Sequence, residues 1–229
     1  MEANTECAGN EVYKLSSKES YMRFPLEFTV HTDLDTVYQF IDYCCKSDPS
    51  HEVYPVTTSL TLKIKRCHPK KPHCRGHLVG YVHFAPLPHA HTLIKFTEDI
   101  ANDWCEPPPP SAFVPIVEYL LVRLMEHDFI DFAIEGKRVV AVFRDANDQV
   151  RQEALSALRR ARLSAQRSLA FVLEREAMYG LDSPVRLMHE RQYYEKTIAE
   201  IDEIVDALSE VSNARLESRM TDHQIDSLD

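Results

Sequence analysis

Apolar and polar residues alternate in four short segments in the first half of the chain. These segments are 26–30, 60–66, 78–84 and 93–97. A period of two places every second side chain on the same face, which is typical of a strand that buries one face and exposes the other. The last three segments follow one another through short connections, so they predict an antiparallel meander.

Two other segments have the residue spacing of amphipathic helices. The first follows an N-cap at Thr32 or Asp33 and ends before Ser47-Asp48-Pro49, and the second covers residues 111–132. In both, apolar residues recur at every third or fourth position, so they line one side of a helix. The order β-α-β-β-β-α predicts an α+β fold, in which a four-stranded antiparallel sheet carries both helices on the same face.

The segment 134–143 is compatible with two structures. One interpretation is an additional edge hairpin that turns at Gly136. The other is a simple link between the first half of the chain and the second. The pattern of apolar residues leaves both open.

The composition of the chain changes at about Asp145. From there to Tyr179 it contains neither Pro nor Gly and is rich in Ala, Leu, Arg and Glu, which favour helices. Gly180 suits the end of one helix, Ser183 suits the N-cap of the next, and Pro184 suits its first turn. Two long helices joined by a turn of a few residues lie antiparallel, so we expect a helical hairpin.

This hairpin carries more apolar positions than one seam needs. From Tyr194 onward, apolar residues are spaced by four, three, four and three residues, as in the seam of a coiled coil. We expect the surplus to contact a further helix, either from a second copy of the chain or from another protein. The residues predicted to form this interaction surface are Leu169, Leu173, Leu187, Tyr194, Ile198, Ile201, Val205 and Leu208.

These patterns divide the chain into four parts. They are a flexible N-terminal segment (1–18), an α+β domain (19–144), the helical hairpin (145–210) and a frayed C-terminal tail (211–229). The first and last parts are polar and lack a hydrophobic period, which is typical of mobile chain ends.

The negative net charge of the chain makes nucleic acid an unfavourable partner. Its 229 residues include 26 basic and 36 acidic side chains, so the formal net charge at pH 7 is −10. Such a chain repels a phosphate backbone on average, which argues against nucleic acid. No run approaches the roughly 20 apolar residues of a membrane helix, and the polar N-terminus lacks the apolar core of a signal peptide. We therefore expect a cytoplasmic protein that does not bind membranes and whose cysteines are reduced.

A loop rich in Cys and His is the candidate metal site. Its thiol and imidazole groups belong to Cys67, His73, Cys74 and His77, and such groups are good ligands for Zn²⁺. Structural zinc sites usually pair ligands two to four residues apart, whereas six residues separate Cys67 from Cys74. A polar loop without a cofactor is the favoured interpretation, and a zinc site is the alternative.

Residues for nucleophilic catalysis are present, but they match no established motif. Cys105 could act with His83 or His91 as a base and with Asp99 or Asp103 as the group that orients the base. The sequence contains no nucleophile elbow, Walker loop, dinucleotide fingerprint or zinc-protease helix. We therefore expect a protein without enzymatic activity.

Residues 161–208 resemble a helical-hairpin module of bacterial signalling and conflict proteins. The resemblance lies in the run from Leu173 to Gly180, in Pro184 after the turn, and in Ile-Ala-Glu-Ile at 198–201. In those proteins the module is an interaction or oligomerisation device beside NTPase, TIR or caspase-like effector domains. Because no effector domain is recognisable here, the resemblance implies an adaptor or regulatory subunit whose effector is another chain. It implies no catalytic residues.

The leading functional hypothesis is therefore a non-enzymatic interaction protein of a bacterial signalling or defence system. It would assemble through its hairpin with itself or with a helical protein partner. The alternative is a small-molecule or zinc sensor, in which the α+β domain binds the ligand and the hairpin transmits the change.

Overall fold

The structure is a computed structural model that describes residues 22–48, 50–67, 76–99, 112–179 and 184–225, with side chains up to residue 215. Within these ranges the chain forms one antiparallel sheet and five α-helices, which confirms the α+β class. The N-terminal segment predicted at 1–18 lies outside the described residues.

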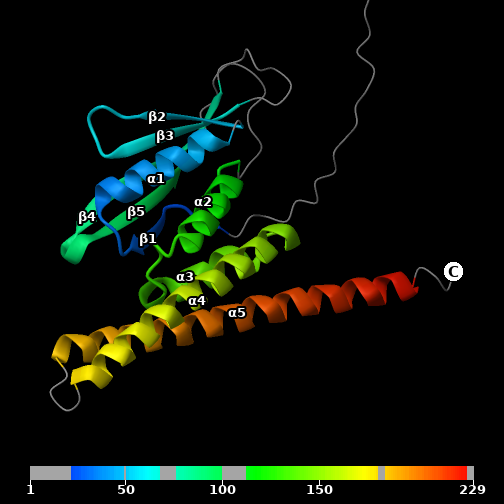
Figure 1. Ribbon diagram of the computed structural model, residues 1–229. Helices are drawn as coiled ribbons and strands as arrows, with labels where there is room; N and C mark the ends of the chain where they lie inside the picture. Colours follow the sequence, from blue (N-terminus) through cyan, green and yellow to red (C-terminus); the bar gives the residue numbers. More distant parts are fainter. Residues whose placement is uncertain (1–21, 49, 68–75, 100–111, 180–183, 226–229) are drawn as a thin grey trace, which may run out of the picture.

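A five-stranded antiparallel sheet forms one layer of the fold (Figure 1). Its strands are β1 (Leu26–Val30), β2 (His51–Pro55), β3 (Thr61–Arg66), β4 (His77–Leu87) and β5 (His91–Glu98), in the spatial order β1-β5-β4-β3-β2. A short 3-10 turn at Pro88–Ala90 joins β4 to β5. The register places Leu62 opposite Val82 and Val82 opposite Phe96, and all three side chains are fully buried. The predicted meander is therefore confirmed as β3, β4 and β5.

The sheet has one strand more than the four expected from the sequence. β2 turns only one apolar side chain toward the helices, that of Val53 opposite Ile64, so no alternating run marks it. It also ends at Pro55, a residue that disfavours central strands but is tolerated at a sheet edge. β2 lies at the edge, beside β3.

The two helices predicted for the first half cover the same face of the sheet (Figure 1). Helix α1 (Leu34–Ser47) begins where the carboxylate of Asp33 accepts a hydrogen bond from the backbone N–H of Thr36, at 3.0 Å. This N-cap satisfies one of the free N–H groups of the first turn. Helix α2 (Val114–Glu126) has Pro115 in its first turn, where the missing N–H costs nothing.

The segment 134–143 is neither a hairpin nor a link, because it lies within helix α3 (Phe132–Arg144). Asp131 caps this helix by accepting a hydrogen bond from the backbone N–H of Ala133 at 3.1 Å. Gly136, which suggested a turn, lies inside the helix where α5 packs closely. A Cβ at this position would lie 3.1 Å from the Glu200 carboxylate and 3.4 Å from a methyl carbon of Ile204. The glycine therefore serves close helix packing.

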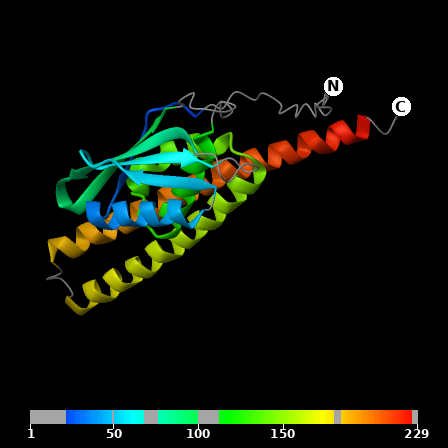
Figure 2. The same ribbon diagram turned by 90° about the horizontal axis from the view of Figure 1, so that it is seen from above.

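Helices α4 (Asp148–Tyr179) and α5 (Val185–Ile225) form the expected antiparallel hairpin. Helix α5 is longer than predicted, since it continues past residue 210 to Ile225. The tail expected from residue 211 is therefore largely helical. Figure 2 shows α5 running beside α4 and then extending beyond its N-terminal end.

One hydrophobic core connects the sheet with all five helices. It runs from the buried strand residues through α2 and α3 into the facing sides of α4 and α5. Helix α2 packs against α4, and α3 packs against α5. The fully buried aromatic residues of this core are Phe28, Phe96, Phe113, Phe132 and Phe143. The hairpin is therefore anchored on the rest of the molecule along part of its length.

None of the helices within the described ranges combines the length and apolar character that crossing a membrane requires.

Candidate interaction surface

The predicted interaction residues of α5 lie mainly inside the molecule. Leu187, Ile201 and Leu208 are buried, while Tyr194, Ile198 and Val205 are half-buried. Helix α3 occupies the side of α5 that the sequence assigned to a partner, because Val139, Val142 and Phe143 belong to the same core cluster. The surplus of apolar residues on α5 is therefore largely used within one chain.

The two predicted residues of α4 differ in their surroundings. Leu169 is half-buried, whereas Leu173 is 44% exposed. The predicted interaction residues of α5 do not include two further buried residues of this helix, Thr197 and Ile204. Ile204 lies three residues after Ile201, so the buried side of α5 is broader than the strict coiled-coil seam.

Ion pairs join the two helices of the hairpin. Arg162 on α4 binds Asp202 on α5 through two hydrogen bonds of 2.5 and 3.1 Å. Nearer the turn, Arg191 on α5 donates a hydrogen bond of 3.0 Å to Glu176 on α4. These pairs link the helices of one chain, so their charges are already matched within the hairpin.

The outer side of α4 carries large apolar side chains that are mostly exposed to solvent. Leu163, Phe171 and Met178 are 52%, 60% and 76% exposed, respectively. They are spaced by eight and seven residues, so they share one face of the helix. On the opposite face, Ala165 and Val172 are buried toward α5. In Figure 2 the C-terminal half of α4, drawn in yellow, lies away from the sheet.

We define the outer stripe of α4 as the six solvent-facing residues along this side. They are Leu163, Arg167, Ala170, Phe171, Glu174 and Met178. The guanidinium of Arg175 lies 5.7 Å from the centre of the Phe171 ring and covers part of it. Three large apolar residues in line on one exposed helix face are typical of a contact surface for another helix.

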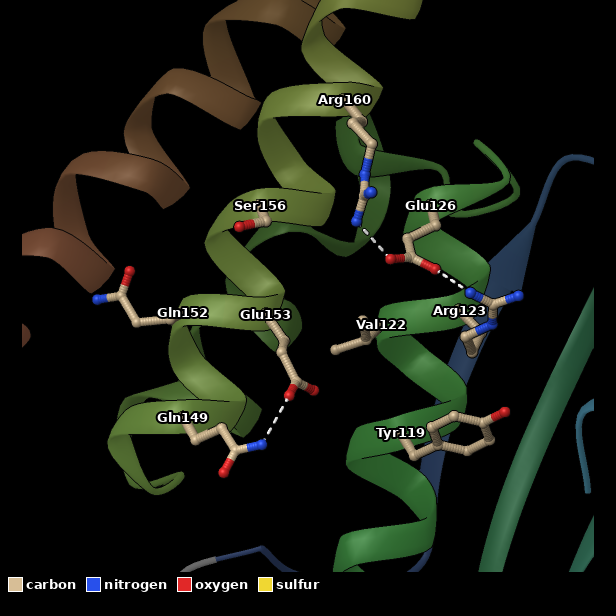
Figure 3. Close-up of a pocket in the computed structure, with 9 residues that line it drawn as sticks. All are labelled: Tyr119, Val122, Arg123, Glu126, Gln149, Gln152, Glu153, Ser156 and Arg160. Atoms are coloured by element: carbon tan, nitrogen blue, oxygen red, sulfur yellow. Dashed lines mark hydrogen bonds and ion pairs between the residues drawn. The ribbon is translucent and has the colours of Figure 1, made fainter. Parts of the chain in front are cut away.

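A groove of about 440 Å³ lies between α2 and α4 (Figure 3). Most of the residues that line it are polar or charged, and several of these are paired with one another. Glu126 on α2 binds both Arg123 on the same helix and Arg160 on α4. Gln149 donates a hydrogen bond of 3.1 Å to Glu153 across one turn of α4. The geometry favours a role in holding α4 against α2.

The described part of the chain includes two of the four predicted metal ligands, Cys67 and His77. His73 and Cys74 lie outside the described residues. The thiol of Cys67 is half-buried, and its pKa is raised by burial and by the nearby Glu52 carboxylate. His77 is buried at the start of β4, and within the described ranges neither of its ring nitrogens has a hydrogen-bond partner. In the described part of the chain, no three His, Cys, Asp or Glu side chains are placed to hold a metal ion.

The residues considered for catalysis are not brought together within the described part of the chain. Asp103 and Cys105 lie outside the described residues, and Asp99 directly follows β5. His83 lies in the middle of β4 and His91 begins β5.

Side-chain hydrogen bonds hold His83 in the sheet. One ring nitrogen lies 3.0 Å from the Thr61 hydroxyl and the other lies 2.8 Å from the Thr97 hydroxyl. Burial, together with the charge of Lys95, lowers the pKa of the imidazole. These contacts tie three neighbouring strands together, which is a structural role.

A polar junction that the sequence did not reveal fixes the hairpin to the α2–α3 turn. Ser164 on α4 donates a hydrogen bond of 3.1 Å to the carboxylate of Asp128, whose pKa is raised by burial. Tyr193 on α5 lies near Asp131, and burial together with that negative charge raises the pKa of its hydroxyl. These residues are far apart in the sequence, so no local pattern indicates that they meet.

Comparison with known proteins adds no assignment. Neither protein-family models nor curated proteins match this sequence, so a functional interpretation rests on the geometry of the outer stripe and its surroundings.

Proposed function

We propose that this chain is a non-enzymatic interaction protein that assembles through the outer stripe of α4. The observation that carries the proposal is the alignment of Leu163, Phe171 and Met178 on one exposed helix face, more than half of each side chain being in contact with solvent. Burying a side chain of this size contributes about 2 kcal/mol. A second helix laid along the stripe would remove all three from water.

The proposed surface differs from the one that the coiled-coil spacing indicated. Ile201 and Leu208 are buried inside the chain, so they stabilise the fold. The residues proposed to contact a partner lie on α4 and face away from α5. In this proposal α4 contacts the partner, and α5 packs against α4 within the chain.

The resemblance of residues 161–208 to an accessory module supports a role as adaptor or regulatory subunit. In this proposal the protein serves a bacterial signalling or defence system, and the effector is carried by another chain. Assembly of the hairpin would then set the number of effectors brought together.

Two variants with matched exposure test the proposal. Phe171 on α4 and Ile134 on α3 are both 60% exposed, so replacing either by Ser removes a comparable apolar surface. The molar mass of each protein is measured by light scattering over a range of concentrations. We expect Phe171→Ser to weaken assembly by roughly a hundredfold, and Ile134→Ser to assemble like the wild type. Equal behaviour of both variants and the wild type would reject the stripe as the assembly surface.

A further inference from the structure

The outer stripe of α4 has the same spacing when read from either end. Leu163, Arg167 and Ala170 are separated by four and three residues, and then Phe171, Glu174 and Met178 are separated by three and four. The centre of this arrangement lies between Ala170 and Phe171. An antiparallel copy centred on the same point would therefore present apolar residues to apolar residues and opposite charges to each other.

We propose that the partner of this stripe is a second copy of the chain, bound antiparallel about a two-fold axis between Ala170 and Phe171. This inference rests on the proposed function and specifies its partner and geometry. In this arrangement Leu163 faces Met178 of the second copy, and Arg167 faces Glu174. The small side chain of Ala170 leaves room for the Phe171 ring of the second copy. Each contact occurs twice, as a two-fold interface requires.

The charges distinguish this arrangement from its alternatives. In a parallel pair, Arg167 would face Arg167 and Glu174 would face Glu174, and like charges repel. An antiparallel pair centred on Arg167 would bring Leu163 opposite Phe171, but it would also place the two Arg167 side chains together. Only the axis between Ala170 and Phe171 matches both the apolar and the charged positions of the stripe.

Arg167 and Glu174 are available for such pairs. Both side chains are exposed, and neither forms an ion pair with any residue in the described part of the chain. By contrast, Arg160, Arg162 and Arg191 are engaged by carboxylates of the same chain. The stripe therefore presents one unmatched positive and one unmatched negative group at symmetric positions.

The length of the stripe limits the strength of the dimer. Residues 163–178 span about 24 Å of helix, at roughly 1.5 Å per residue. A single pair of helices of this length buries less surface than the roughly 1,600 Å² of a standard stable interface. We therefore expect a dimer that dissociates on dilution and weakens as salt screens the two charged pairs.

Charge reversal of the full-length chain tests this geometry. Arg167→Glu and Glu174→Arg each place like charges at both symmetric contacts, and we expect each to raise the dissociation constant of the dimer roughly tenfold. The double variant Arg167→Glu, Glu174→Arg restores both attractions and returns the constant to that of the wild type. An equimolar mixture of the two single variants forms a mixed dimer, because each supplies the charges that the other lacks. Dimerisation is followed by light scattering, with circular dichroism to verify folding.

Three results would overturn the inference. If the single variants dimerise like the wild type while Phe171→Ser dissociates, the stripe is an assembly surface with a different geometry, so the proposed function remains. If the double variant is as weak as the single variants, Arg167 and Glu174 do not face each other. If the wild type is a monomer at all concentrations, self-association by any geometry is rejected.

Discussion

The guanidinium of Arg151 holds the C-terminal end of α3 through the carbonyl oxygen of Phe143, to which its Nε donates a hydrogen bond of 3.2 Å. The same side chain is fully buried and also donates to the carbonyl oxygens of Arg144 and Ala146, at 3.1 and 2.5 Å. A helix leaves its last carbonyls without partners. Arg151 satisfies them from the first turn of α4 and so fixes the angle between α3 and the hairpin.

Replacing Arg151 by Met should destabilise the protein strongly. The substitution removes the Arg151 donor from three carbonyl groups near the α3–α4 junction. Arg215 still donates to those of Arg144 and Ala146, but it does not reach that of Phe143. We expect the free energy of unfolding to fall by about 3 kcal/mol, measured by urea denaturation. The neighbouring Gln152→Ala, at an exposed position of α4, should change it by less than about 0.5 kcal/mol. Similar small effects of both changes would contradict the capping role.

Ile201 should contribute to folding rather than to assembly. Its side chain projects from α5 and is completely buried in the hydrophobic core, so Ile201→Ala leaves a cavity. We expect a loss of about 3 kcal/mol in the free energy of unfolding, with the molar mass of the folded protein unchanged. An Ile201→Ala protein that unfolds like the wild type but loses its assembly would show that this position faces a partner.

The alternating and helical patterns predicted most of the elements, because each is a local property of the sequence. Leu62 and Ile64 mark the buried face of β3, and Asp33 marks the start of α1. Helix α3 was missed because Gly136 is read locally as a turn residue. Its role depends on Glu200 and Ile204, which are distant in the sequence.

A similar reason explains why the sequence places Ile201 and Leu208 at a partner, although both are buried within the chain. The spacing of Ile201 and Leu208 correctly indicates a buried seam, but it does not show that α3 supplies the other half. On α4, Arg167 and Glu174 interrupt the apolar residues of the outer stripe, so periodicity alone gives no signal. Exposure in the folded chain reveals the stripe.

Glu118 should make stability depend on pH. Its side chain is buried in α2, and burial raises the pKa of its carboxyl group from 4.5 to about 7. Between these two values the folded protein retains a proton that the unfolded chain has lost. The free energy of unfolding therefore falls as the pH rises from 4.5 to about 7. Above pH 7 the effect of Glu118 on stability no longer changes with pH.

The variant Glu118→Gln isolates this effect. Because glutamine stays neutral, the variant should be more stable than the wild type at pH 8 by up to roughly 3 kcal/mol. The difference should shrink as the pH falls toward 4.5. Urea denaturation of both proteins at a series of pH values provides the comparison, and a difference that does not vary with pH would refute the assignment.

The two adjacent free cysteines of α1 should be unreactive toward alkylating agents in the folded protein. Cys44 and Cys45 are both buried, and burial raises the pKa of the Cys45 thiol to about 12. At pH 7.5 almost none of this group is thiolate, the form that reacts with alkylating agents. We expect mass spectrometry of iodoacetamide-treated protein to show modification of Cys45 only after unfolding in urea. Rapid labelling of Cys45 in the native protein would contradict its buried placement.

Hydrogen exchange at two protein concentrations tests most directly whether the outer stripe of α4 is the assembly surface. Docking of a second helix suppresses local opening, so the amides of residues 163–178 should exchange more slowly at high concentration than at low concentration. Peptides from α3, including Ile134, should exchange at the same rate in both samples, and Phe171→Ser should abolish the difference in α4. Exchange in 163–178 that is independent of concentration, in a wild-type protein whose mass shows that it has assembled, would place the interface elsewhere and contradict the proposed function.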